Sequence, residues 1–425
     1  MIVSAPASGQ GKTTVTLGLL TALRRRGVQV VSAKSGPDYI DPAFHAAATG
    51  APCINLDSWA MSLQSIQSRA PSGEVLVIEG AMGLLDAAVG AAPGGPGSTQ
   101  AVAEALELPV ILVVDVARMG QSVVAVVDGF NRAGPRPLAG VVLNRLGSAR
   151  HAEMVRHAVE PVAPVLGLLP RREDLSMPSR HLGLVQAVEH PDLRAFLNRA
   201  ADWIEEGCDL DRILRTATPV TRSTNLVACC RPLGQRIAVA CDEAFAFAYP
   251  HMLADWRSQG AEVLPFSPLA DEPPPAGADA VFLPGGYPEL HAGKLSGAHA
   301  FLAGLAYVAG RGGLIYGECG GYMVLGQGLV DAGGQRHAMA GLLPLETSFA
   351  ERKRHLGYRE LGAADGPLEG QYRGHEFHYA STIKADGTPL FQVKDAAGTK
   401  LPPTGLISGR VMGSFAHIIE GRSAT

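Results

Sequence analysis

Short runs of apolar residues recur along the first half of the chain, separated by longer stretches in which apolar positions have a helical spacing. The runs are I-V-S-A, V-Q-V-V-S-A, E-V-L-V-I-E, P-V-I-L-V-V-D and L-A-G-V-V-L-N. Continuous runs rich in β-branched residues are typical of parallel strands that helices cover on both faces. This half therefore predicts a doubly wound α/β domain.

The pattern stops near residue 205 and resumes at residue 236. Between them Thr, Arg and Pro occur without a clear period, which predicts a connection over 206–235. The runs R-I-A-V-A-C, A-V-F-L-P and G-L-I-Y-G then restart the α/β alternation. We therefore expect two α/β domains, 1–205 and 236–425, each of roughly 200 residues and able to bury a full core.

Charge and composition exclude several classes of protein. The formal net charge of -4 gives no general basic surface, which argues against binding to nucleic acid or to a membrane. No apolar run approaches the roughly 18 residues of a spanning helix, and the N-terminus lacks a signal peptide's basic region, so we expect a cytoplasmic protein. The six cysteines show no C-x-x-C spacing, so no zinc site or disulfide framework is indicated; they are Cys53, Cys208, Cys229, Cys230, Cys241 and Cys319.

A glycine-containing loop, A-P-A-S-G-Q-G-K-T-T, lies between the first predicted strand and the first predicted helix. Small residues let backbone N–H groups surround phosphate oxygens, Lys12 can reach the β and γ phosphates of ATP, and Thr13 can hold Mg²⁺. Pro6 replaces the first glycine of the common pattern, so this is a variant P-loop. The predicted nucleotide-binding residues are Ser8, Gly9, Gln10, Gly11, Lys12, Thr13 and Thr14.

Acidic residues follow the next predicted strands, at the sheet edge where open α/β sheets bind ligands. Asp38 and Asp41 lie in K-S-G-P-D-Y-I-D, Glu79 and Asp86 in E-G-A-M-G-L-L-D, and Asp115 closes a further strand. A Mg–ATP site needs carboxylates, and Asp38 and Glu79 are the candidate metal ligands. Any one acid could equally cap a helix, but their grouping around one P-loop favours the metal site.

Cys319 lies in G-E-C-G-G directly after an apolar run, the form of a nucleophile elbow. Facing a helix N-terminus is expected to lower the pKa of its thiol below the usual value of about 8.5. The N–H groups of Gly320 and of Gly286, in P-G-G-Y-P-E, would form an oxyanion hole, with His417 as general base. The alternative, a buried structural cysteine, does not need such a turn.

Two further segments carry weaker signals. H-E-F-H at 375–378 resembles the helix of a zinc protease, but its histidines are three residues apart instead of four, so we exclude a metal there. Arg352, Lys353, Arg354 and Arg359 form a basic cluster that either docks carboxylates or is a solvated face.

Taken in order, the motifs resemble the cobyrinic or hydrogenobyrinic acid a,c-diamide synthases of cobalamin biosynthesis over nearly the whole chain. The most specific pieces are A-P-A-S-G-Q-G-K-T-T, K-S-G-P-D-Y-I-D-P, E-G-A-M-G-L-L-D, D-E-A-F-A-F-A-Y, G-E-C-G-G-Y-M-V-L-G, T-S-F-A-E-R-K-R-H-L-G-Y-R and R-G-H-E-F-H-Y. The first domain also looks like dethiobiotin synthetase and the second like a class I glutamine amidotransferase, with a flavodoxin-like fold. Ordinary members of that class have a glutamate two residues after the histidine, where this chain has Ile419, so the resemblance implies a Cys319–His417 dyad.

The resemblance implies a ligase that forms C–N bonds at the a and c acetates of a corrinoid, with ATP, Mg²⁺ and glutamine. ATP would convert each carboxylate into an acyl phosphate, and Cys319 would release ammonia from glutamine. Because ammonia at neutral pH is mostly unreactive ammonium, we expect a shielded channel between the domains. The resemblance assigns orientation of metal and substrate to Asp38, Tyr39, Asp41 and Asp86, and the prediction allows for a homodimer.

Four other functions stay open from the sequence. Two lie in the same class: cobyric acid synthase, and a diamide synthase for a nickel tetrapyrrole; the segment H-L-G-Y-R favours an a,c-diamide synthase. The third is a P-loop switch ATPase with an inactive C-terminal binding module, which would not hydrolyse glutamine. The last is a carboxylase like dethiobiotin synthetase, which would use bicarbonate instead.

Overall fold

The computed structural model describes residues 1–90, 95–134, 136–177, 179–180, 183–224, 228 and 230–422. The chain forms two compact units, Met1–Val227 and Ala228–Thr425. The division falls within the predicted connection 206–235, part of which, with Cys229, lies outside the described residues. The exact limits of the two domains stay a prediction.

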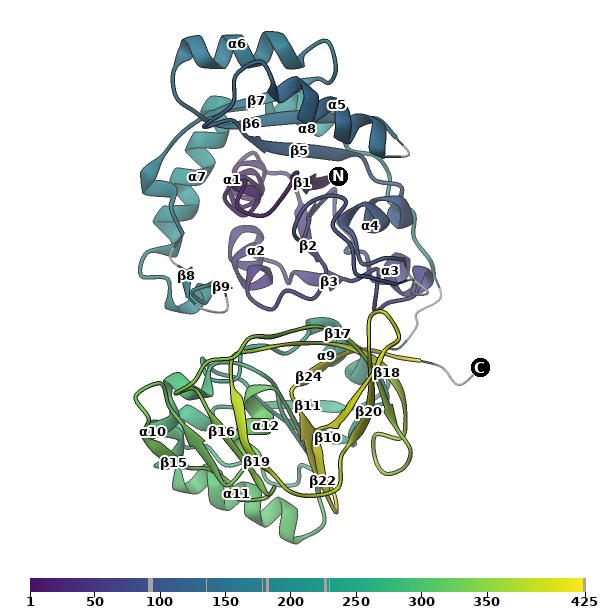
Figure 1. Cartoon of the computed structure of the whole chain (residues 1–425), viewed down its shortest axis with the longest axis vertical. Helices are drawn as coiled ribbons and strands as arrows, with labels where there is room; N and C mark the ends of the chain where they lie inside the picture. The colour runs from purple at the N-terminus through teal and green to yellow at the C-terminus, as the bar shows by residue number, and fades with distance from the viewer. Residues whose placement is uncertain are drawn as a thin grey trace. The chain divides into compact units, whose positions relative to one another are not determined.

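The first unit is built on a seven-stranded parallel sheet of order β3-β2-β4-β1-β5-β6-β7 (Figure 1). Five strands lie in the predicted apolar runs, which confirms the α/β fold with a parallel sheet; β3 and β7 are additional. The strands are β1 (Ile2–Ser4), β2 (Val30–Ser35), β3 (Ile54–Leu56), β4 (Val75–Glu79), β5 (Val110–Asp115), β6 (Gly140–Leu146) and β7 (Val165–Pro170).

Helices flank this sheet, and one pair packs backbone to backbone. A Cβ atom on Gly18 of α1 would lie 2.6 Å from the carbonyl oxygen of Ala200 in α7, so glycine permits this close approach. The helix α8 lies in the predicted connection, and its Leu210 and Ile213 are buried; six residues are too few to show a helical period. The helices are α1 (Lys12–Arg25), α2 (Asp41–Thr49), α3 (Leu63–Arg69), α4 (Thr99–Leu106), α5 (Val123–Ala133), α6 (Ala149–Val159), α7 (Leu193–Gly207) and α8 (Leu210–Arg215), with β8 (Ser179–Arg180) and β9 (Gly183–Leu184) pairing separately.

The second unit contains a six-stranded sheet of order β11-β10-β12-β13-β23-β22. All neighbours are parallel except β22 and β23, and the first five strands have the flavodoxin order 2-1-3-4-5. The strands are β10 (Arg236–Ala240), β11 (Glu262–Phe266), β12 (Ala280–Leu283), β13 (Leu314–Glu318), β22 (Leu406–Ser408) and β23 (Val411–Ser414). The helices are α9 (Pro250–Ser258), α10 (Ala292–Ser296), α11 (His299–Gly310) and α12 (Gly320–Leu325).

Two further sheets of the second unit were not expected from the sequence. One has the order β15-β14-β16-β19, and the other, β21-β20-β17-β18-β24, is antiparallel throughout. Polar residues interrupt most of these strands, and several strands are only partly buried, so the sequence shows no long apolar runs there. They are β14 (Gly328–Val330), β15 (Arg336–Ala338), β16 (Leu345–Ser348), β17 (His355–Ala363), β18 (Gly370–His378), β19 (Ser381–Ala385), β20 (Phe391–Asp395), β21 (Lys400–Thr404) and β24 (Ala416–Arg422).

None of the described helices combines the length and the apolar character that crossing a membrane requires.

Candidate functional site

The predicted phosphate loop joins β1 to α1. Gly9 and Gly11 have left-handed backbone angles, with φ of 79° and 89°, which favour glycine. Gly11 is the residue before α1, so Lys12 and Thr13 begin the helix. A Cβ on Gly11 would also collide with the side-chain nitrogen of Asn144. The loop therefore turns directly into a helix N-terminus, as phosphate binding requires.

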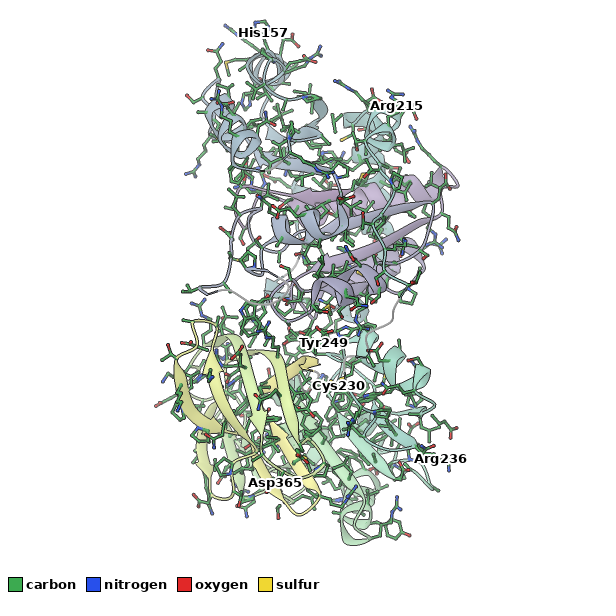
Figure 2. All side chains as sticks on the ribbon, turned by 90° about the vertical axis from the view of Figure 1, so that its right-hand side faces the viewer. His157, Arg215, Cys230, Arg236, Tyr249 and Asp365 are labelled. Carbon is green, nitrogen blue, oxygen red and sulfur yellow. The ribbon has the colours of Figure 1, made fainter. Side chains whose placement is uncertain are left out.

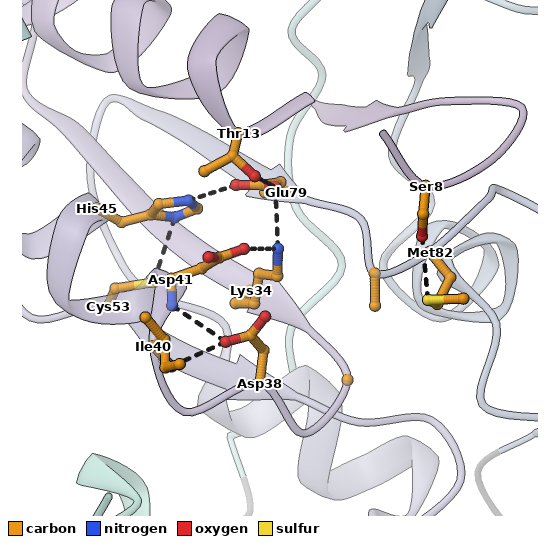
Figure 3. Close-up of polar contacts among 12 residues, drawn as sticks. Ser8, Thr13, Lys34, Asp38, Ile40, Asp41, His45, Cys53, Glu79 and Met82 are labelled. Carbon is orange, nitrogen blue, oxygen red and sulfur yellow. Dashed lines mark hydrogen bonds and ion pairs between the residues drawn. The ribbon is translucent and has the colours of Figure 1, made fainter. Parts of the chain in front are cut away.

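Glu79, at the end of β4, accepts hydrogen bonds from three surrounding side chains (Figure 3). Thr13 Oγ1 donates to Oε1 at 2.7 Å, and Lys34 Nζ donates to the same oxygen at 2.9 Å. His45 Nε2 lies 2.6 Å from Oε2. Lys34 also pairs with Asp41. The network brings the predicted ligands Thr13 and Glu79 into contact.

Opposite charges within this network keep its buried groups ionised. Burial alone would raise the pKa of Glu79, but Lys34 and His45 outweigh it and hold that pKa well below its usual range. Burial alone would lower the pKa of Lys34, but Asp41 and Glu79 outweigh it and raise that pKa. An ionised carboxylate beside a threonine hydroxyl is a set of hard oxygen donors, which fits Mg²⁺.

The other predicted acids have more local contacts. Asp38 Oδ1 accepts from the backbone N–H groups of Ile40 and Asp41, at 2.8 and 3.0 Å, and so caps the start of α2. Asp86 is exposed, and its Oδ2 accepts from the N–H of Gly83 at 2.7 Å. Tyr39 is half-buried. Asp38 and Asp41 lie close to Glu79 in Figure 3, whereas Asp86 lies in the segment between β4 and α4.

A pocket of about 720 Å³ adjoins the phosphate loop. Asn144 Nδ2 donates to the carbonyl oxygen of Gln10 at 2.9 Å, and Gln10 Oε1 accepts from the N–H of Asp115 at 2.8 Å. These contacts fix the loop against the ends of β5 and β6. Of the residues lining this pocket, only those of the phosphate loop and Asp115 were predicted from the sequence. The lining residues include Gln10, Gly11, Thr14, Asp115, Asn144 and Arg145.

Cys319 occupies a strained turn between β13 and α12. Its φ of 49° and ψ of -106° are rare for a residue with a side chain. The N–H of Cys319 donates to the carbonyl oxygen of Ser414 at 2.8 Å, which holds the turn against β23. Strain of this kind, held by surrounding structure, is typical of a nucleophile elbow.

Gly321 lets the elbow helix lie on the sheet. A Cβ atom there would overlap the carbonyl oxygen of Leu283 in β12. We expect Gly321→Ala to destabilise the second unit by about 1–3 kcal/mol, because the backbone must shift, and to displace the elbow. Thermal unfolding and glutamine hydrolysis measure the two effects. Gly310→Ala is the matched control, because a Cβ atom on that glycine of the same unit would meet no other atom within 4 Å, and equal effects of the two changes would contradict the packing argument.

The residues predicted for glutamine hydrolysis converge around Cys319. A Cβ on Gly285 would meet His417 Nε2 at 2.9 Å and the Cβ of Cys319 at 3.1 Å, so imidazole and thiol flank the same glycine. A Cβ on Gly320 would lie 3.1 Å from the backbone nitrogen of Gly286. The two predicted oxyanion-hole glycines are therefore adjacent.

The expected lowering of the thiol pKa is wrong for this structure. Burial raises the pKa of Cys319, and the charge of Glu289 adds to this, whereas the N–H of Gly320 lowers it by less. Burial also lowers the pKa of His417 to about 3, assisted by His375 and His378. The structure therefore holds a neutral thiol beside a neutral imidazole, a pair in which the histidine can accept the thiol proton.

The H-E-F-H segment lies in strand β18, so helix spacing did not apply to it. In a strand, Glu376 and His378 share a face, and ligand atoms of His355, Glu376 and His378 lie within 4.8 Å of one another. The carboxylate of Glu376 already pairs with Arg359 Nε at 2.7 Å and with His378 Nε2 at 2.9 Å. Arg359 thus belongs to an ion pair, while the other members of the basic cluster, at 352–354, are exposed.

Sequence reasoning missed three buried side chains of these sites: Lys34, His45 and Glu318. Asp41 and His45 are four residues apart on α2, a spacing that places two side chains on one helix face and could have indicated His45. Glu318 lies next to the nucleophile, where an elbow pattern specifies no particular residue. Tyr249, labelled in Figure 2, also lies near the site, with its ring 6.4 Å from that of His417.

Comparison with known proteins covers both units. Residues 1–185 match the CobQ/CobB/MinD/ParA nucleotide binding domain, and residues 236–424 match the CobB/CobQ-like glutamine amidotransferase domain. A hydrogenobyrinate a,c-diamide synthase of Rhizobium meliloti is 54% identical over 99% of both chains. Its counterpart in Brucella abortus is 53% identical over 99% of this chain and 98% of its own, and that of Mesorhizobium japonicum is 50% identical over 100% and 99%.

Proposed function

The chain belongs to the hydrogenobyrinate a,c-diamide synthase family, and from this premise we propose that it amidates the a and c carboxylates of hydrogenobyrinic acid. Glutamine supplies the nitrogen and ATP the driving force. The observation that carries this function is the presence, in one chain, of a phosphate loop in the first unit and an elbow cysteine beside a histidine in the second.

The first unit activates the carboxylate. A carboxylate resists attack by ammonia, so its oxygen must first take the γ-phosphoryl group of ATP and become part of an acyl phosphate. Loop N–H groups and Lys12 hold the phosphates, and the 720 Å³ pocket receives the rest of the nucleotide. Thr13 and Glu79, with Asp38, would hold Mg²⁺, which neutralises phosphate charge when bound. Asp41, Tyr39 and Asp86 remain candidates for orienting the substrate.

The second unit releases ammonia. His417 takes the proton of the Cys319 thiol as the sulfur attacks the side-chain carbonyl carbon of glutamine. The N–H groups of Gly320 and Gly286 receive the negative charge on the carbonyl oxygen. The proton passes to the departing nitrogen, and water then cleaves the thioester to give glutamate. The ammonia attacks the acyl phosphate, which releases phosphate.

The competing functions predict different reactions. Cobyric acid synthase would amidate other carboxylates, a nickel-tetrapyrrole enzyme would require that metal in the ring, and a switch ATPase would leave glutamine intact. The similarity to hydrogenobyrinate a,c-diamide synthases along the whole chain favours metal-free hydrogenobyrinic acid over the cobalt-containing cobyrinic acid. The cytoplasmic location, the shielded ammonia channel and a homodimer stay predictions.

We expect the intact protein to convert hydrogenobyrinic acid to its diamide with a kcat/KM at least about tenfold above that for cobyrinic acid, a difference of 1.4 kcal/mol. Competition between the two acids, followed by mass spectrometry of the products, measures this ratio. A preference for cobyrinic acid would overturn the choice of ring, and amidation of neither acid would overturn the function.

A further inference from the structure

The carboxyl group of Glu318 is buried beside His417, and the family resemblance assigns no role to it. Glu318 Oε2 lies 3.7 Å from His417 Nδ1, and both side chains are fully buried. Glu318 is the last residue of β13 and immediately precedes the nucleophile, while His417 is in β24. Two segments about a hundred residues apart thus meet behind the thiol.

The other carboxylate oxygen is fixed in place. The N–H of Ile418 donates to Glu318 Oε1 at 2.9 Å, and the hydroxyl of Tyr316 donates to it at 3.1 Å. Oε2 has no hydrogen-bond partner among the described residues. Glu318 is therefore anchored through one oxygen while the other faces the imidazole.

We propose that Glu318 is the positioning residue of the glutaminase site and takes the part that a glutamate two residues after the histidine plays in ordinary class I members. It holds His417 with its proton on Nδ1, so that Nε2 takes up the thiol proton, and it stabilises the imidazolium that results. The residue two positions after His417 is Ile419, which cannot do this. The inference rests on the proposed glutamine hydrolysis.

The charge state of Glu318 gives a testable signature. Burial raises its pKa to about 8, against the opposing effects of the Ile418 N–H and the Tyr316 hydroxyl. The flanking strands β12 and β23 contain no titratable side chain. The charges of His375, His378 and Glu376 in β18 act on His417, and that of Glu289 acts on Cys319. Cys319 and the ring of Tyr249 also lie near His417. Because these groups can also titrate, only a comparison of variants can show that the pH dependence of glutamine hydrolysis comes from Glu318.

The decisive experiment compares Glu318→Gln, Glu318→Asp and Glu420→Gln in the full chain, by steady-state glutamine hydrolysis from about pH 6 to about pH 9.5. Glu318→Gln keeps an oxygen that can accept the hydrogen bond from the N–H of Ile418, but it removes the negative charge of the carboxylate. We expect its kcat to fall by about 10²–10⁴-fold with KM for glutamine nearly unchanged, and its rise in rate towards pH 8 to disappear. Glu318→Asp should recover part of the kcat and retain the rise.

Glu420→Gln is the matched control, a buried glutamate three residues after the histidine, and should behave as the wild type. Wild-type kcat and pH profile in Glu318→Gln would overturn the proposal. If that variant does not fold, Glu318→Asp decides: unchanged kcat contradicts the positioning role, and reduced kcat with the rise retained supports it. A wild-type protein that hydrolyses no glutamine would instead refute the proposed function.

The melting temperature gives a second test. Glu318→Gln should raise it if Glu318 has the proposed role, and should lower it if Glu318 is only structural. The unfolded chain ionises Glu318 near the usual pKa of 4.5 and the folded chain near 8. Between these values the unfolded state binds fewer protons, so the group lowers the free energy of unfolding as pH rises. Glu318→Gln should therefore raise the melting temperature of the second unit more at pH 8 than at pH 4.5. A lower melting temperature at both values would mark a merely structural residue and contradict the proposal.

Discussion

Replacing Cys319 by alanine abolishes glutamine-dependent amidation while ammonia-dependent amidation continues. We expect the rate with glutamine to fall by at least about 10³-fold, because no other group can form the thioester. With ammonium chloride, the rate should stay within about twofold of the wild type, since the phosphate loop and its acids lie in the other unit. Formation of the amidated corrinoid with each nitrogen source measures both rates.

Cys241→Ala is the matched control, because that thiol belongs to the same unit and is exposed. It should change neither rate. If Cys319→Ala kept its use of glutamine, the elbow would not be the glutaminase site. If it lost the use of ammonia as well, the two reactions could not be assigned to separate units.

Replacing Lys12 by alanine has the complementary effect and removes amidation with either nitrogen source. Lys12 begins α1 and is largely buried, and burial lowers its pKa while the charges of Glu79, Asp41 and Asp86 oppose this. Loss of one such cation from a phosphoryl-transfer site should reduce kcat by on the order of 10²–10³-fold. Phosphate release and diamide formation, each with glutamine and with ammonium chloride, measure the loss.

The control for this change is Arg150→Ala, which removes an exposed cation from the same unit. Its rates should equal those of the wild type. A Lys12→Ala protein that still amidates with ammonia would show that the loop does not hold the transferred phosphoryl group.

Periodicity predicted the parts of the fold that are buried on both faces. Five strands of the first sheet are continuous apolar runs and were predicted from the sequence: β1, β2, β4, β5 and β6. β3 has only three residues, and β11 contains Pro265, so neither gives a clear run. β18 reads G-Q-Y-R-G-H-E-F-H, in which polar residues dominate because the strand is only partly buried. Tertiary pairing, not local preference, forms such a strand.

The site was predictable where a backbone turn demands particular residues. Gly11 is needed for its positive φ, and the small residues around Cys319 are needed for the elbow, so both loops could be located from sequence alone. Contacts between side chains that are far apart in the sequence could not be predicted. Nothing in the sequence indicates that Glu318 meets His417, or that burial of Cys319 outweighs the helix N-terminus in setting its pKa. Both depend on what surrounds the groups in three dimensions.

The most direct test of the account is amidation of hydrogenobyrinic acid by the intact protein with ATP and amide-¹⁵N glutamine, in the presence of unlabelled ammonium chloride. Mass spectrometry of the product counts the labelled nitrogens. We expect a diamide whose two new amides both carry ¹⁵N, because we propose that ammonia released at Cys319 reaches the acyl phosphate without mixing with the solution. A product without amides, or one labelled no more than the free ammonia, would contradict it.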